Sequence, residues 1–179
     1  MNYVLPKLMG LSLLVWALAA HAQADAELWE LWQQSDEANT TQIDHSRWQR
    51  FLDGYVGTDT SGVNLVRYAD VTEPDHQNLR DYLDAMQTID PRDFPKEEQY
   101  AYWINLYNAA TIDIVLRNPD KSSILRMGER FFSIGPWNDE VLQVAGVGLT
   151  LNDIEHRILR PIWKLTAKPS FRFLRCVGK

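Results

Sequence analysis

Two adjacent ionisable residues near the end of the chain, Glu155 and His156, have the side chains that proton transfer requires. A histidine changes its charge near neutral pH, and a neighbouring carboxylate can orient it or exchange a proton with it. Arg160 follows His156 by four residues, so the two share one face of an α-helix. We therefore take Glu155 and His156 as candidate catalytic residues. Arg160 is a candidate for positioning a substrate or for a structural polar network.

The same segment also has a purely structural interpretation, because a helix is predicted to begin here. Asn152-x-x-Glu155 can form a capping box in which the carboxylate bonds the cap amide, and Thr150-x-x-Asp153 offers a second register. Adjacent residues of an α-helix point about 100° apart, which makes it difficult for Glu155 and His156 to face one small pocket. The sequence leaves both interpretations open.

A second candidate group lies in the apolar segment 100–111, which reads YAYWINLYNAAT. Asn105 and Asn108 share one helix face, and Tyr107 lies beside them. A buried amide without a hydrogen bond costs about 1–3 kcal/mol, so either the fold supplies partners or a site uses these side chains. The three residues either orient a substrate or a catalytic histidine, or hold neighbouring loops to the helix. Asp113 either extends this network or lies on a solvated edge.

The segments WINLYNAAT (103–111) and LTLNDIEHRILR (149–160) resemble the signature motifs of DUF547, a bacterial and plant family of unknown function. The resemblance runs from about residue 43, through IDHSRWQRFL and YADVT, to about residue 169. It implies an architecture rather than a mechanism, since the family offers no settled reaction.

The resemblance also draws attention to Cys176. Members of the family usually continue through a Pro-Arg-x-His-Phe-Ala-Leu-Asn-Cys-like segment into a further element, whereas this chain ends at Lys179. Arg172 stands where the family often has histidine, and Cys176 aligns with the family cysteine only if one residue is skipped. A thiol with a histidine and an amide or carboxylate is the basis of thiol hydrolases and transferases. Cys176 is thus either a retained nucleophile or part of a C-terminally incomplete domain without activity.

The first residues predict export. Lys7 is the only charged residue before Asp25, residues 8–20 are apolar, and AHA at 20–22 has the form of a cleavage site. This pattern is typical of a secretory signal peptide cleaved after Ala22. The apolar run of about 13 residues is shorter than the roughly 17–25 that span a bilayer, although an uncleaved anchor is an alternative. We expect a periplasmic or secreted protein without a permanent membrane span after cleavage.

Composition argues against several classes of function. The net charge is −6 and the basic residues are mostly scattered, which argues against a nucleic-acid partner. His45, His76 and His156 are far apart in the sequence, and no His/Cys/Asp/Glu set recurs at ligand spacing, so we expect neither a metal site nor a cofactor. His45 and His76 each lie in a predicted first helical turn, where we expect solvated positions. Cys176 is the only cysteine, which excludes an intramolecular disulfide.

The hydrophobic pattern predicts a helix-dominated α+β fold, a single domain with a small antiparallel hairpin or sheet around a long buried helix. Residues 1–22 form the signal peptide, 23–42 a leader helix and loop, and 43–179 a DUF547-like domain that is C-terminally incomplete. The expected elements are helices at 26–34, 45–55, 73–87, 96–117 and 152–163, a strand at 63–71, and a hairpin at 141–151 with a turn at Ala145-Gly146 and a bulge at Gly148.

Three functions remain open on this basis. The first is an exported domain of unknown biochemical activity with a hydrolase- or transferase-like site that truncation impairs. The second is a noncatalytic extracytoplasmic domain that binds a small molecule or a protein. The third is a fragment without a function of its own. A pocket around a histidine with a perturbed pKa would favour the enzyme.

Overall fold

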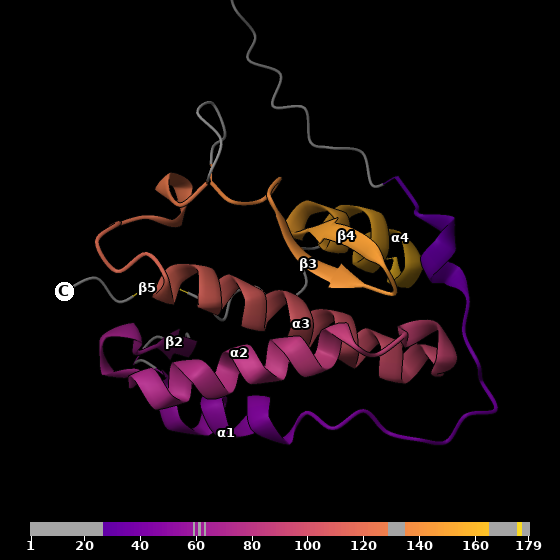
Figure 1. The fold of residues 1–179 in the computed structure, drawn as a ribbon, viewed down its shortest axis with the longest axis horizontal. Helices are drawn as coiled ribbons and strands as arrows, with labels where there is room; N and C mark the ends of the chain where they lie inside the picture. Colours follow the sequence, from indigo (N-terminus) through magenta and orange to yellow (C-terminus); the bar gives the residue numbers. More distant parts are fainter. Residues whose placement is uncertain are drawn as a thin grey trace, which may run out of the picture.

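The longest helix lies at the centre of the fold because it is apolar on nearly every side. The computed structural model describes residues 27–58, 60, 62, 64–128, 135–164 and 175–176. Helix α3 (Lys96–Leu116) is surrounded by the other elements (Figure 1). Helix α2 (Glu73–Gln87) packs antiparallel to it, and α1 (Ser46–Tyr55) packs on α2. The core therefore forms around α3, as its pattern predicts.

Two small sheets accompany the helices. Strands β1 (Val56–Thr58) and β2 (Asn64–Val66) are antiparallel, and β5 (Arg175–Cys176) pairs with β2 in parallel. Strands β3 (Glu140–Val144) and β4 (Val147–Thr150) form a separate hairpin. The described residues also include the short 3₁₀ helices η1 (Glu30–Gln33), η2 (Tyr68–Asp70), η3 (Pro91–Asp93) and η4 (Ile124–Arg126). The predicted helix-dominated α+β fold is confirmed.

The hairpin turns where the sequence predicts. Ala145 and Gly146 have φ values of 48° and 78°, the left-handed backbone that a two-residue hairpin turn of type I′ requires. The expected bulge at Gly148 is wrong, because the register shift lies on β3, between Glu140 and Leu142.

The last helical segment differs most from the α-helix that the sequence predicts. It begins as a π-helix, η5 (Asp153–Leu159), and continues as α4 (Arg160–Trp163). The Thr150 hydroxyl accepts a hydrogen bond from the backbone N–H of Asp153 at 3.0 Å. In return, the Asp153 carboxylate accepts one from the backbone N–H of Thr150 at 3.0 Å. The second capping register is therefore the one that forms. Asn152 donates to the Asn138 side chain instead.

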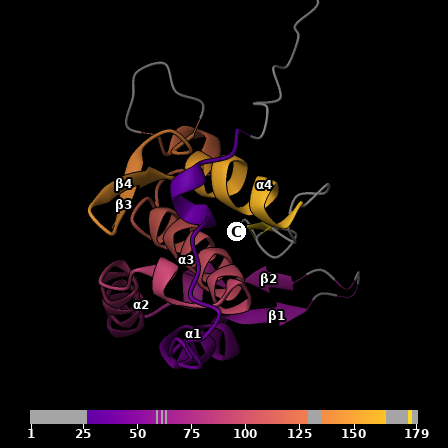
Figure 2. The same ribbon diagram turned by 90° about the vertical axis from the view of Figure 1, so that its right-hand side faces the viewer.

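Pro161 leaves a backbone carbonyl free for the N-terminal segment. Because proline has no N–H, it cannot bond the Arg157 carbonyl four residues earlier, and this carbonyl accepts the Trp29 amide at 2.9 Å. The Arg157 guanidinium also lies 4.1 Å from the centre of the Trp29 ring. Trp32 is fully buried and contacts Trp103 edge-on at 5.1 Å. The N-terminal segment around Trp29 and Trp32 thus lies beside α4 (Figure 2). Of the helix predicted at 26–34, the structure shows only the short η1.

The predicted caps of α1 and α2 form, whereas a predicted strand is shorter than expected. Thr72 caps α2 by accepting the Asp75 amide at 3.3 Å, and the Asp44 carboxylate accepts the Ser46 amide at 2.8 Å as α1 begins. The predicted strand at 63–71 shortens to β2 and is followed by η2.

The predicted signal peptide at 1–22 lies outside the described residues. Within the part of the chain that the structure describes, no helix combines the length and apolarity needed to cross a membrane.

Candidate functional site

The π-helix brings Glu155 to Arg160 and Tyr107. Residues five apart lie above one another in a π-helix, and the Arg160 Nη2 donates to Glu155 Oε1 at 2.8 Å. The Tyr107 hydroxyl of α3 donates to Glu155 Oε2 at 3.4 Å. The Glu155 side chain is 4% exposed, so its ion pair with Arg160 is buried and joins η5 to α4, while the Tyr107 hydrogen bond joins η5 to α3.

His156 lies beside this ion pair. Its Nε2 is 4.0 Å from Glu155 Oε1, which is too far for a hydrogen bond, and its side chain is 19% exposed. Both Glu155 oxygens already have donors. Burial, with the Glu155 charge, raises the pKa of Tyr107 and keeps that phenol protonated. This geometry favours the structural interpretation of Glu155, Tyr107 and Arg160, while His156 stays a prediction as a catalytic residue.

The two asparagines of the first motif have different surroundings. The Trp48 indole donates to Asn105 Oδ1 at 3.1 Å, which ties α1 to α3. Asn108 Oδ1 is buried and has no hydrogen bond within the described residues. Asn105 therefore has a structural partner in α1 and not in η5.

Cys176 is described only through its backbone. It pairs with Val66 of β2, and β5 lies near the C-terminal end of α3 (Figure 1). Its side chain lies outside the described part of the structure, so its predicted catalytic role remains a prediction.

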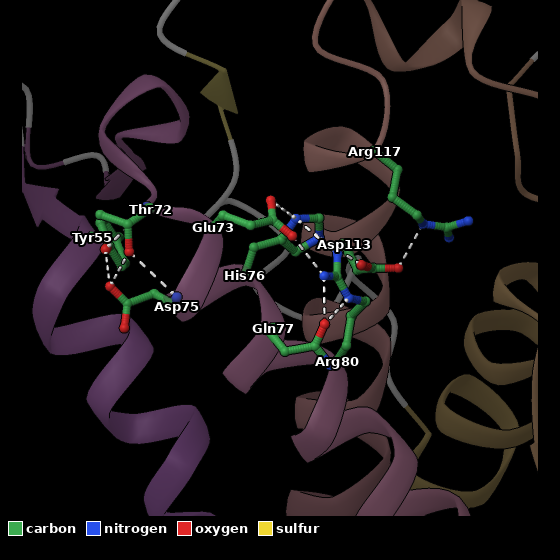
Figure 3. A network of polar contacts seen from close by, with 9 residues as sticks. All are labelled: Tyr55, Thr72, Glu73, Asp75, His76, Gln77, Arg80, Asp113 and Arg117. Carbon is green, nitrogen blue, oxygen red and sulfur yellow. Dashed lines mark hydrogen bonds and ion pairs between the residues drawn. The ribbon is translucent and has the colours of Figure 1, made fainter.

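The sequence missed a buried pair between α2 and α3. His76 Nε2 lies 2.8 Å from Asp113 Oδ1, and each residue is 7% exposed (Figure 3). The expectation of a solvated His76 is wrong, as is that of a solvated edge at Asp113. A sequence signal existed, because His76 shares a helical stripe with Leu79, Leu83 and Met86, all of which are buried.

The pair extends into a chain of polar contacts. Arg117 Nε donates to Asp113 Oδ2 at 2.8 Å. Because an ionised carboxylate only accepts hydrogen bonds, His76 donates through Nε2. Its Nδ1 can then accept from Arg80 Nη1 at 3.1 Å. Arg80 also donates to Glu73 at 2.8 Å (Figure 3). Both ring nitrogens of His76 are therefore engaged, which suits a positioning role better than that of a free base.

A cleft of about 330 Å³ lies next to this polar chain, between α2, α3 and β3. Its apolar lining consists of Leu83, Ala110, Val141 and Leu142. Its polar lining consists of Gln77, Arg80, Asp84, Gln87, Asp113 and Arg117. Small-molecule sites combine apolar surface with polar groups that fix the ligand, and this cleft has both, with more polar than apolar lining residues. Asp113, which the sequence raised only as a candidate extension of the Asn105–Tyr107–Asn108 network, lines this cleft, whereas Glu155, His156 and Arg160 are not among its lining residues.

His45 is another histidine that the sequence places in solvent. Its Nδ1 lies 2.7 Å from the Tyr82 hydroxyl, and burial lowers the pKa of His45. Among the described residues, no three His, Cys, Asp or Glu side chains gather in a way that could hold a metal ion.

Comparison with known protein families gives a match to part of the chain. Residues 91–175 match the family model described as "Protein of unknown function, DUF547". The match includes both motifs and confirms the resemblance, although it begins well after residue 43. No curated protein and no solved structure matches the chain. The cleft combines α3 and β3, which lie inside the matched region, with α2, which precedes it.

Removing the shared carboxylate tests the polar chain. Asp113→Ala leaves the His76 Nε2–H and the Arg117 Nε–H without their acceptor, so we expect the free energy of unfolding to fall by about 3 kcal/mol. Urea unfolding followed by circular dichroism at pH 7 measures this change. Asp120→Ala, at an exposed position, is the control and should change the value by less than about 0.5 kcal/mol. Equal effects of the two substitutions would contradict the assignment.

Proposed function

We propose that this chain, whose residues 91–175 match the DUF547 family model, is an exported domain that binds a small molecule in the cleft between α2, α3 and β3. The observation that carries the proposal is the cleft itself, about 330 Å³ in volume and bordered by the His76–Asp113–Arg117 chain. Its volume is at the lower end of the range for ligand sites.

The fixed position of the polar groups supports binding. Asp113 is held by His76 and Arg117 at 2.8 Å each. On β3, the Gln143 amide donates to the Gln87 side chain of α2 at 2.7 Å, which joins the hairpin to the cleft wall. A site whose side chains are already ordered loses less conformational entropy on binding. The polar side chains on both walls of the cleft are therefore already ordered before a ligand binds.

Binding is favoured over catalysis by the engagement of the candidate acid–base groups. Both oxygens of Glu155 accept hydrogen bonds, and both ring nitrogens of His76 have partners. A general base must reach the proton it abstracts, and these groups would have to break existing contacts to do so.

A screen for ligands tests the binding function. We expect members of a panel of short carboxylates, amines, alcohols and amides to shift the amide NMR signals of Ala110 and Leu142. Val141→Phe should abolish these shifts, because the larger ring occupies the cleft that Val141 lines. Val147→Phe is the matched control, since Val147 lies on the same hairpin away from the lining. Shifts that survive Val141→Phe, or no shifts at all, would overturn the proposal.

Export is the second part of the proposal and depends on the N-terminal sequence pattern. Expression of the full chain in a bacterium with two membranes should yield a periplasmic protein that begins at Gln23, because a signal peptidase cleaves after small residues. Intact-mass measurement detects this product. Replacement of Ala20 and Ala22 by arginine should block processing. A wild-type product that keeps residues 1–22 would contradict cleavage.

A thiol hydrolase or transferase site at His156, Glu155 and Cys176 is the second candidate function. The sequence pattern carries this candidate, and His156 Nε2 lies 4.0 Å from the buried Glu155 carboxylate, a distance at which the two do not form a hydrogen bond. An activated thiol would react with iodoacetamide with an apparent pKa well below the ordinary value of about 8.5. His156→Gln should return this pKa to the ordinary value, whereas His45→Gln should not. An ordinary thiol pKa in the wild-type protein would exclude this function.

A further inference from the structure

We infer that the ligand of the cleft is a small organic carboxylate with a short apolar chain, held by the Arg117 guanidinium. This inference rests on the proposed binding function and adds the chemical class of the ligand. Three observations support this ligand class: the hydrogen-bond donors of the cleft that have no partner among the described residues, the apolar side chains that line the cleft, and the cleft volume.

The polar groups of the cleft differ in how much of their capacity is already used. Arg80 donates from all three guanidinium nitrogens, to Gln77, Glu73 and His76. Asp113 accepts at both oxygens. Arg117 donates through Nε to Asp113, and its two Nη groups have no hydrogen bond in the described structure. The free capacity of the two arginines is therefore concentrated on Arg117.

The contact with Asp113 orients Arg117 without using its outer edge. The two Nη groups of a guanidinium form a planar fork that matches the two oxygens of a carboxylate. Asp113 is itself fixed by His76 at 2.8 Å. The Arg117 side chain is 47% exposed, so a ligand can reach it from the open side. The His76–Asp113 pair would thus act as a positioning pair for the binding group.

The rest of the cleft limits the size and charge of the ligand. A volume of about 330 Å³ accommodates about ten non-hydrogen atoms, by comparison with the roughly 30 Å³ that one water occupies in the liquid. Leu83, Ala110 and Leu142 are buried and offer an apolar surface for a hydrocarbon chain. Asp84 also lines the cleft and has no ion pair in the described structure. Its negative charge repels any anion but a phosphate dianion about twice as strongly as a carboxylate, so among anions a monovalent carboxylate fits better.

Three probes of equal chain length separate the contribution of the head-group charge from that of the apolar chain. Hexanoate, 1-hexanol and hexylamine share the apolar chain and differ in the charge of the head group. We expect hexanoate to shift the Ala110 and Leu142 amide signals of the full chain at concentrations about tenfold lower than hexanol. The factor of about ten corresponds to a charge-assisted hydrogen bond of about 1.5 kcal/mol. Hexylamine should bind no better than hexanol.

Substitutions of Arg117 identify the binding group. Arg117→Gln should weaken hexanoate binding about tenfold and leave hexanol binding unchanged. Arg117→Lys keeps the positive charge near Asp113 but lacks the planar fork, so it should weaken hexanoate binding as well. If circular dichroism shows that Arg117→Gln does not fold, Arg117→Lys still tests whether hexanoate binding depends on the guanidinium. Arg126→Gln, at an exposed arginine outside the cleft, is the matched control and should have no effect.

The outcomes distinguish the ligand class from the binding function. Equal affinity for hexanoate and hexanol, a preference for hexylamine, or unchanged hexanoate binding in both Arg117 variants would overturn the carboxylate inference. Binding of any of the three probes that Val141→Phe abolishes would still support the cleft as a ligand site. If no probe shifts the cleft signals, the carboxylate inference fails, and the wider panel then decides whether the binding function fails with it.

Discussion

The burial of helix α3 constrains the polar side chains that it carries. A polar group that loses its water costs free energy unless another partner replaces that water. On α3 the partners come from separate elements: the α1 indole for Asn105, His76 of α2 for Asp113, and Glu155 of η5 for Tyr107. Directional contacts therefore fix three elements around α3, in addition to apolar packing.

Asp113 links this architecture to the proposed site. Its carboxylate is buried between a histidine of α2 and Arg117 at the end of α3. A buried charge is tolerated when partners and hydrogen bonds surround it, and removing one partner is costly. The same contacts hold the Arg117 Nε, while the Arg117 side chain is 47% exposed and lines the cleft. A structural requirement thus creates a fixed cationic group beside an apolar surface.

The π-helix changes the relation between the residues that were candidates for catalysis. In a regular α-helix, Arg160 would share a face with His156. The i to i+5 pattern of η5 instead pairs Arg160 with Glu155 and leaves His156 beside them. Pro161 follows and frees the Arg157 carbonyl for the N-terminal segment. The segment from 153 to 161 therefore contacts α3 through Tyr107 and the N-terminal segment through Trp29, which supports its structural role.

The sequence by itself determined the fold class, the central helix, the hairpin turn and the resemblance to the DUF547 family model, because periodicity, turn residues and motifs are local properties of the chain. It did not determine which polar residues meet. Asp113 and His76 are 37 positions apart, and only the antiparallel packing of α2 on α3 brings them together. The cleft likewise combines α2, α3 and β3, which are separate in the sequence. Local patterns indicate which face of a helix is buried, whereas the partner of a buried charge depends on the tertiary arrangement of the helices.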